Sequence, residues 1–146
     1  MIRFLILILL VGLLTLFQTL GFSIFGVKPN LALTAVVVAS FFVVNIREGL
    51  VLILSAALLL KFNAVFNLDI LIFSLIGTAA LIFKKYLIWQ PLINCLILIG
   101  LATSGFYLFL SPSLIISGIF LQEIIYNIIL GIFVFAFIRW LKKIYF

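Results

Sequence analysis

The sequence contains no histidine, one cysteine and only three acidic residues in 146 positions. Metal and redox centres in proteins are usually held by imidazole, thiolate or clustered carboxylate groups, and this chain has too few of them to assemble such a set. The acids Glu48, Asp69 and Glu123 are far apart in the sequence, so no pair of carboxylates is positioned for general acid–base catalysis. We therefore expect a protein that is not an enzyme, with no catalytic residues, no metal ion and no cofactor.

The chain also has few charged residues and an unusually large share of apolar ones. Charged residues make up 8% of the chain, hydrophobic residues make up 68%, and the mean hydropathy is +1.60. A soluble domain could not bury this much apolar surface, so the composition predicts an all-α integral membrane protein. The stretches between apolar runs are only a few residues long. The sequence therefore predicts a single transmembrane domain over residues 1–146.

Six apolar runs, separated by short breaks with polar residues or proline, predict a bundle of six transmembrane helices. The expected spans are Phe4–Phe25, Leu31–Ile46, Gly49–Phe66, Ile70–Phe83, Leu87–Leu110 and Leu114–Leu141. The first, fifth and sixth exceed the ~20 residues that a crossing needs. The third and fourth are short, and the third crosses only if Lys61 extends its side chain to the interface. The alternative is a re-entrant hairpin over Gly49–Phe83.

The distribution of basic residues predicts the orientation. If the N-terminus is cytoplasmic, six crossings place seven of the nine basic residues inside and leave Lys28 and Lys61 outside. The seven are Arg3, Arg47, Lys84, Lys85, Arg139, Lys142 and Lys143. Cytoplasmic loops carry such an excess of Lys and Arg, and a re-entrant hairpin would leave the assignment unchanged. We expect both termini to face the cytoplasm.

The net charge of +6 raises the question of nucleic-acid binding. The basic residues are scattered at span ends, however, and form no patch that alternates with aromatic residues. Contact with the anionic headgroups of the lipid bilayer explains them more simply. We expect no nucleic-acid partner.

Glu123 is the most unusual residue of the predicted spans. Counted from Ser113 at ~1.5 Å per residue, it lies ~15 Å deep, near the middle of a ~30 Å hydrocarbon layer. An acid there costs roughly 2.5–3.5 kcal/mol, so other groups must compensate for it. Asn127 follows one helical turn later on the same face. Because no histidine or second carboxylate accompanies it, we interpret Glu123 as a buried, protonated or hydrogen-bonded residue, with a proton site as the alternative.

By depth alone, Thr15 and Thr78 could reach Glu123. Other polar and small residues inside the spans, Gln18 among them, are typical of contacts between helices, where polar groups bond across and glycines allow close approach. The glycines that we expect at such contacts are Gly12, Gly77, Gly100 and Gly131.

Pro29-Asn30-Leu31 predicts the start of the second span. Proline favours the beginning of a helix, and the side chain of Asn30 can accept a hydrogen bond from a free amide there. With the late Gln18 of the first span, this motif resembles the rod shape-determining MreD family. The last span carries the other elements of that resemblance, Glu123 and Asn127 one turn apart, before the basic tail Arg139, Lys142 and Lys143.

The resemblance covers nearly the whole chain and implies both a fold and a function. The implied fold is a six-helix bundle similar to the substrate-binding subunits of energy-coupling-factor transporters. The implied function is that of a scaffold in the bacterial inner membrane, which binds MreC and links MreB filaments to the peptidoglycan synthases of cell elongation. Gln18, Pro29, Asn30, Glu123 and Asn127 are the candidate structural or partner-binding positions.

The chain also departs from the family pattern. Members often carry a glycine-rich stretch with an acid at the end of the third span, whereas this chain has Leu-Lys-Phe-Asn in that region. The alternative function is that of a substrate-binding subunit of a vitamin-type transporter. Such subunits usually present an Ala-x-x-x-Ala face on the first span, and Phe4–Phe25 contains no alanine. A small proton-coupled carrier is the third possibility and rests on Glu123 alone.

Overall fold

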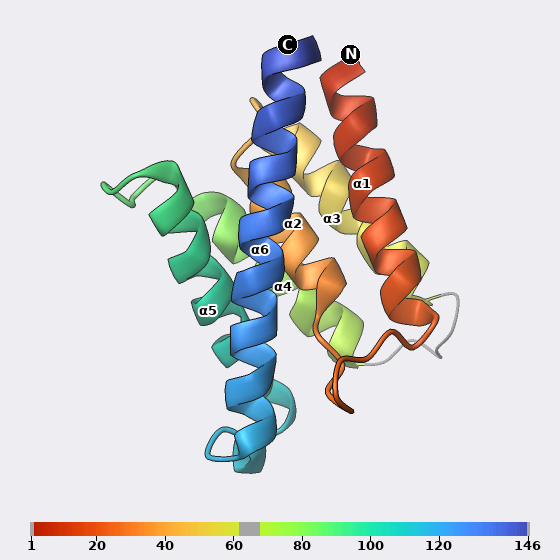
Figure 1. Cartoon of the computed structure of the whole chain (residues 1–146), viewed down its shortest axis with the longest axis vertical. Helices are drawn as coiled ribbons and strands as arrows, with labels where there is room; N and C mark the ends of the chain where they lie inside the picture. Colours follow the sequence, from red (N-terminus) through yellow and green to blue (C-terminus); the bar gives the residue numbers. More distant parts are fainter. Residues whose placement is uncertain (1, 62–67, 146) are drawn as a thin grey trace.

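The computed structural model describes residues 2–61 and 68–145, and within them it is helical, with no strand. The α-helices are α1 (Ile2–Thr19), α2 (Leu31–Ser40), α3 (Ile46–Lys61), α4 (Leu68–Phe83), α5 (Pro91–Leu110) and α6 (Gly118–Tyr145), with a 3-10 turn, η1 (Pro112–Leu114), before α6. This confirms the all-α class. Successive helices alternate in direction, so both termini lie at one end of the molecule (Figure 1). We call this the termini end and the opposite end the far end.

Helix lengths divide the described elements into two groups. α1, α5 and α6 are long and apolar enough to cross a membrane, as expected for the first, fifth and sixth runs. α3 and α4 have 16 residues each, and α2 has only ten. At 1.5 Å per residue α2 is ~15 Å long, about half a hydrocarbon layer. The expected span Leu31–Ile46 was therefore too long at its C-terminal end. Positions 62–66 of the expected third span lie outside the described residues.

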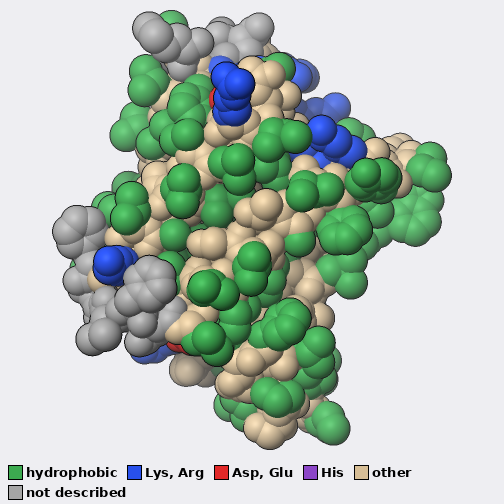
Figure 2. All heavy atoms as spheres, turned by 180° about the vertical axis from the view of Figure 1, so that it is seen from behind, with side chains coloured by type: hydrophobic (Ala, Val, Ile, Leu, Met, Phe, Trp, Pro, Cys, Tyr) green, Lys and Arg blue, Asp and Glu red, His purple; other side chains and the backbone are tan. Residues whose placement is uncertain are grey.

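α2 is the central helix of the bundle. All ten of its residues are buried, and it contacts each of the other five α-helices. In Figure 1 it lies behind α6 and between α1 and α5. A helix that is apolar on every side is stable only when other elements enclose it, and the run of Ala and Val residues in α2 meets that condition. The other helices form a shell whose outer side chains are mostly apolar, as Figure 2 shows for one face, with Lys and Arg mainly toward the termini end.

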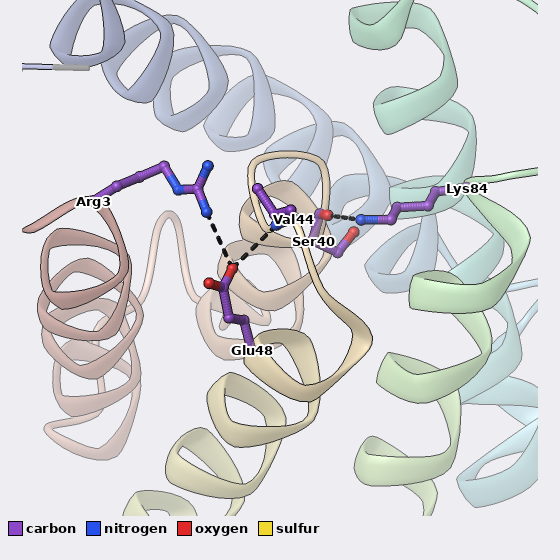
Figure 3. A network of polar contacts seen from close by, with 5 residues as sticks. All are labelled: Arg3, Ser40, Val44, Glu48 and Lys84. Carbon is purple, nitrogen blue, oxygen red and sulfur yellow. Dashed lines mark hydrogen bonds and ion pairs between the residues drawn. The ribbon is translucent and has the colours of Figure 1, made fainter. Parts of the chain in front are cut away.

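A polar network holds α2 and α3 at the termini end (Figure 3). Lys84, which follows α4, donates through Nζ to the carbonyl oxygen of Ser40 in the last turn of α2. Burial lowers the pKa of Lys84, and the charge of Lys85 adds to the effect. Glu48, in the first turn of α3, forms an ion pair with Arg3 of α1 at 3.2 Å and accepts a bond from the Val44 amide at 3.0 Å. Glu48 thus connects α1 with the start of α3.

The glycines provide a test of this packing. A Cβ at Gly131 of α6 would collide with Cδ1 of the buried Ile99 in α5, whereas a Cβ at Gly100 of α5 would meet no atom within 4 Å among the described residues. The predicted close contact between helices is thus confirmed at Gly131, and the same prediction for Gly100 is wrong.

We expect Gly131→Ala to lower the free energy of unfolding by about 1–2 kcal/mol, because overpacking exceeds the gain in helix propensity. The matched variant Gly100→Ala should stabilise the protein by up to about 1 kcal/mol, since only the propensity gain applies there. Unfolding in mixed micelles, followed by circular dichroism, measures both variants. Equal effects of the two variants would show that α5 and α6 are not in close contact at Gly131.

Candidate functional site at the start of α2

The N-terminus of α2 lies inside the protein, where its free amide groups need partners. A helix leaves its first four N–H groups without partners in the helix, and in an apolar medium each unsatisfied group costs several kcal/mol. At α2 all four are satisfied. The amide of Leu31 bonds to the Pro29 carbonyl at 3.0 Å, and the amide of the N-cap residue Asn30 bonds to Oδ1 of Asn127 at 3.0 Å. The Leu33 amide bonds to Oδ1 of Asn30 at 3.1 Å, which confirms Asn30 as the capping residue.

The fourth partner comes from α1. Oε1 of Gln18 accepts the hydrogen bond of the Ala32 amide at 2.7 Å. Gln18 is half-buried in the last turns of α1, where the connection to α2 begins. A glutamine late in the first helix therefore completes the cap of the second.

Asn127 of α6 joins three helices at the same point. Its Oδ1 accepts a hydrogen bond from the Asn30 amide at 3.0 Å, and its Nδ2 donates to Oγ1 of Thr103 in α5 at 3.0 Å. Asn127 is fully buried, so both bonds form away from solvent. The cap of α2 is consequently fastened to α5 and α6 as well as to α1. We call Gln18, Pro29, Asn30, Thr103 and Asn127 the α2 junction.

Glu123 lies one turn before Asn127 and is 8% exposed. The hydroxyl of Tyr107 in α5 donates a hydrogen bond to its Oε2. The Tyr107 ring packs edge-on against Phe120 of α6, with ring centroids 5.1 Å apart, and this contact orients the hydroxyl toward α6. Glu123 thus bonds to a neighbouring helix and is buried between α5 and α6.

Two expectations about Glu123 need correction. It follows Gly118, the first residue of α6, by only five positions, which is about 7–8 Å along the axis instead of ~15 Å from Ser113. The estimate was wrong because residues 112–117 form η1 and a turn before α6 begins. Glu123 is therefore close to the far end. The hydroxyls of Thr15 and Thr78 bond to carbonyls of their own helices at 2.7 and 2.8 Å, and neither is a partner of Glu123.

Sequence reasoning missed Tyr107 and Thr103. The short connection between α5 and α6 could have identified Tyr107 from the sequence as a partner of Glu123. Two helices joined by a short loop run antiparallel, so residues at similar distances from the loop lie at similar depth. Tyr107 precedes the end of α5 by three positions and Glu123 follows the start of α6 by five. A tyrosine at this place is therefore a natural partner for the acid.

A cavity of about 560 Å³ opens beside the α2 junction at the far end. Its lining combines apolar side chains of α3, α4 and α5 with polar residues from most of the surrounding elements. The polar residues are Gln18, Lys28, Asn30, Asp69, Tyr107, Ser111 and Glu123. In residues 2–61 and 68–145 no three His, Cys, Asp or Glu side chains come together as a metal site would require. The arrangement offers hydrogen bonds and charges for binding.

Comparisons with protein-family models, with curated proteins and with solved structures gave no match to this chain. The resemblance to the MreD family and the fold similarity to energy-coupling-factor subunits stay predictions.

Proposed function

We propose that this chain is a non-enzymatic scaffold subunit of the rod-shape machinery in the bacterial inner membrane, with the role of MreD. One observation carries the proposal. Four of the residues that carry the resemblance, Gln18, Pro29, Asn30 and Asn127, belong to the α2 junction, although they come from α1, from the residues before α2 and from α6. Their polar groups bond to the backbone of α2 or to Thr103, so they stabilise one arrangement of helices. Residues that stabilise one arrangement of helices are typical of a rigid scaffold to which other proteins bind.

The arrangement of the ends supports a multi-pass orientation with both termini in the cytoplasm. Both termini lie at the same end, as an even number of crossings requires (Figure 1). The network of Arg3, Glu48 and Lys84 lies at this end, and Lys28 and Asp69 line the cavity at the other. In this proposal all six helices cross the membrane or, in the case of α2, lie enclosed within it. The antiparallel neighbours α3 and α4 then cross separately instead of forming a re-entrant hairpin.

Co-purification tests the scaffold role. The full chain, expressed with an MreC-like single-span protein, should be recovered with it in stoichiometric amounts after detergent extraction, and addition of an MreB-like filament protein should extend the complex. Glu123→Gln should retain the partner, because the amide keeps an acceptor for Tyr107. Recovery of this chain alone, or capture of unrelated single-span proteins in equal amounts, would contradict the proposal. Adjacent MreC-like and MreB-like genes would support it independently.

The far-end cavity favours a second candidate, the substrate-binding subunit of a small-molecule transporter. The structure brings seven polar or charged residues to this one cavity. Ligand pockets typically have such mixed linings and volumes of roughly 300–1,000 Å³. Loss of uptake of a small molecule in Glu123→Gln, with every protein partner still bound, would favour the transporter over the scaffold.

A further inference from the structure

The cavity at the far end is lined by two residues of opposite charge that form no ion pair with one another. Lys28, in the connection between α1 and α2, and Asp69, in the first turn of α4, are both exposed residues of its lining. Among the described residues the only ion pair is Arg3–Glu48, at the termini end. Lys28 and Asp69 are therefore available to charges on a bound molecule.

The buried side of the cavity is rich in hydrogen-bond acceptors. Glu123 is 8% exposed and belongs to the lining, and its carboxyl group has acceptor capacity beyond its bonds with Tyr107 and Asn127. Because the Tyr107 proton is directed at Glu123, the hydroxyl oxygen presents lone pairs as well. An ammonium group has three donors and no acceptor, so it suits such a set of acceptors.

The remaining wall is apolar and comes from helices on different sides of the cavity. Phe73 of α4 and Phe106 and Leu110 of α5 contribute to it, together with Leu60 of α3. A ligand with an apolar portion would gain from contact with this wall at roughly 25 cal/mol per Å² of buried apolar surface. Charged groups at the rim and apolar groups at the wall favour an amphiphilic ligand over a simple ion.

We propose that this cavity binds an amphiphilic zwitterion, with its ammonium group at Glu123 and Asp69 and its anionic group at Lys28. The same chemistry occurs in the headgroup of an aminophospholipid and in a free zwitterion such as an apolar amino acid. The inference goes beyond the scaffold role and does not depend on it, because no partner protein is needed to form the cavity.

Ligand binding to the purified full chain tests the proposal with three probes: phosphatidylethanolamine, soluble glycerophosphoethanolamine and leucine. Native mass spectrometry follows the lipid, and the shift of the thermal midpoint follows the soluble compounds. We expect at least one probe to bind, with affinity about tenfold lower in Lys28→Gln and in Asp69→Asn, as for the loss of one charge pair. Lys85→Gln, an exposed lysine at the termini end, is the matched control and should bind like the unaltered protein.

The outcomes distinguish a lipid headgroup from a soluble zwitterion as the ligand. Binding of phosphatidylethanolamine alone identifies a lipid headgroup site, and binding of a soluble zwitterion identifies a free ligand. The proposal is overturned if none of the probes binds, if anionic phosphatidylglycerol binds as well as phosphatidylethanolamine, or if Lys28→Gln and Asp69→Asn bind like Lys85→Gln. Co-purification of the same two variants with an MreC-like partner tests the scaffold role separately, so failure of one proposal is distinguishable from failure of the other.

Discussion

Replacing Asn127 with leucine should lower the free energy of unfolding by about 2–4 kcal/mol, which is a large part of the stability of a small protein. The change removes the acceptor of the Asn30 amide and the donor to Thr103 while keeping a side chain of similar size. Single hydrogen bonds between membrane helices contribute only about 0.6 kcal/mol on average. The expected loss is larger because a buried backbone amide is left without a partner. Unfolding in mixed detergent micelles measures it.

Two further variants make the comparison specific. Gln122→Leu changes an exposed residue of α6 five positions before Asn127 and should leave stability nearly unchanged. Gln18→Leu removes the acceptor of the Ala32 amide in the α2 junction. Because Gln18 is half-buried and lines the cavity, a water molecule can take the place of this acceptor. The free energy of unfolding should therefore fall less than in Asn127→Leu. Equal stability of Asn127→Leu and Gln122→Leu would mean that the junction does not hold α2.

Tyr107→Phe should cost about 1–3 kcal/mol, the range for leaving a buried polar group without its hydrogen-bond partner. The change removes only the hydroxyl that donates to Glu123 and leaves the ring contact with Phe120 in place. The buried acid is then left without this partner. The same micelle unfolding experiment gives the value, and Tyr126→Phe in α6 is a matched control for the loss of a hydroxyl.

A double-mutant cycle separates the bond from other effects of the change. In the background of Glu123→Leu, which removes the acid, Tyr107→Phe should have little further effect, because the hydroxyl has lost its acceptor. An equal cost of Tyr107→Phe in both backgrounds would mean that Tyr107 stabilises the protein through contacts other than Glu123.

The sequence was sufficient to select most residues of the α2 junction, and the reason is physical. Water is absent from an apolar run, so a polar residue such as Asn127 must bond within the protein, and its position alone marks it as important. Asn30 was identifiable as a helix cap from Pro29 and the apolar run that follows. What could not be predicted was which polar groups meet, because this depends on how the helices pack.

The boundaries of the helices were less predictable than their number. Nothing in the apolar run after Leu31 ends a helix at Ser40, since Phe41, Phe42 and Val43 continue it. The helix closes there with turn bonds of Phe41 and Phe42, and Lys84, from beyond α4, donates to the Ser40 carbonyl. Similarly, Leu114–Ile116 belong to the same apolar run as α6, but Pro112 and Gly118 divide it into η1 and the helix. Tertiary contacts and local turns thus moved both boundaries.

The cap of α2 has a consequence for how the protein is made. The amide of Asn30 finds its acceptor in Asn127, which is separated from it by 97 positions and is therefore synthesised much later. Until then α2 is a short helix with an unsatisfied amide, which is unfavourable in lipid. We therefore expect α2 to enter the bilayer only together with later helices, so that a ribosome-bound chain truncated before α6 keeps α2 at the insertion machinery.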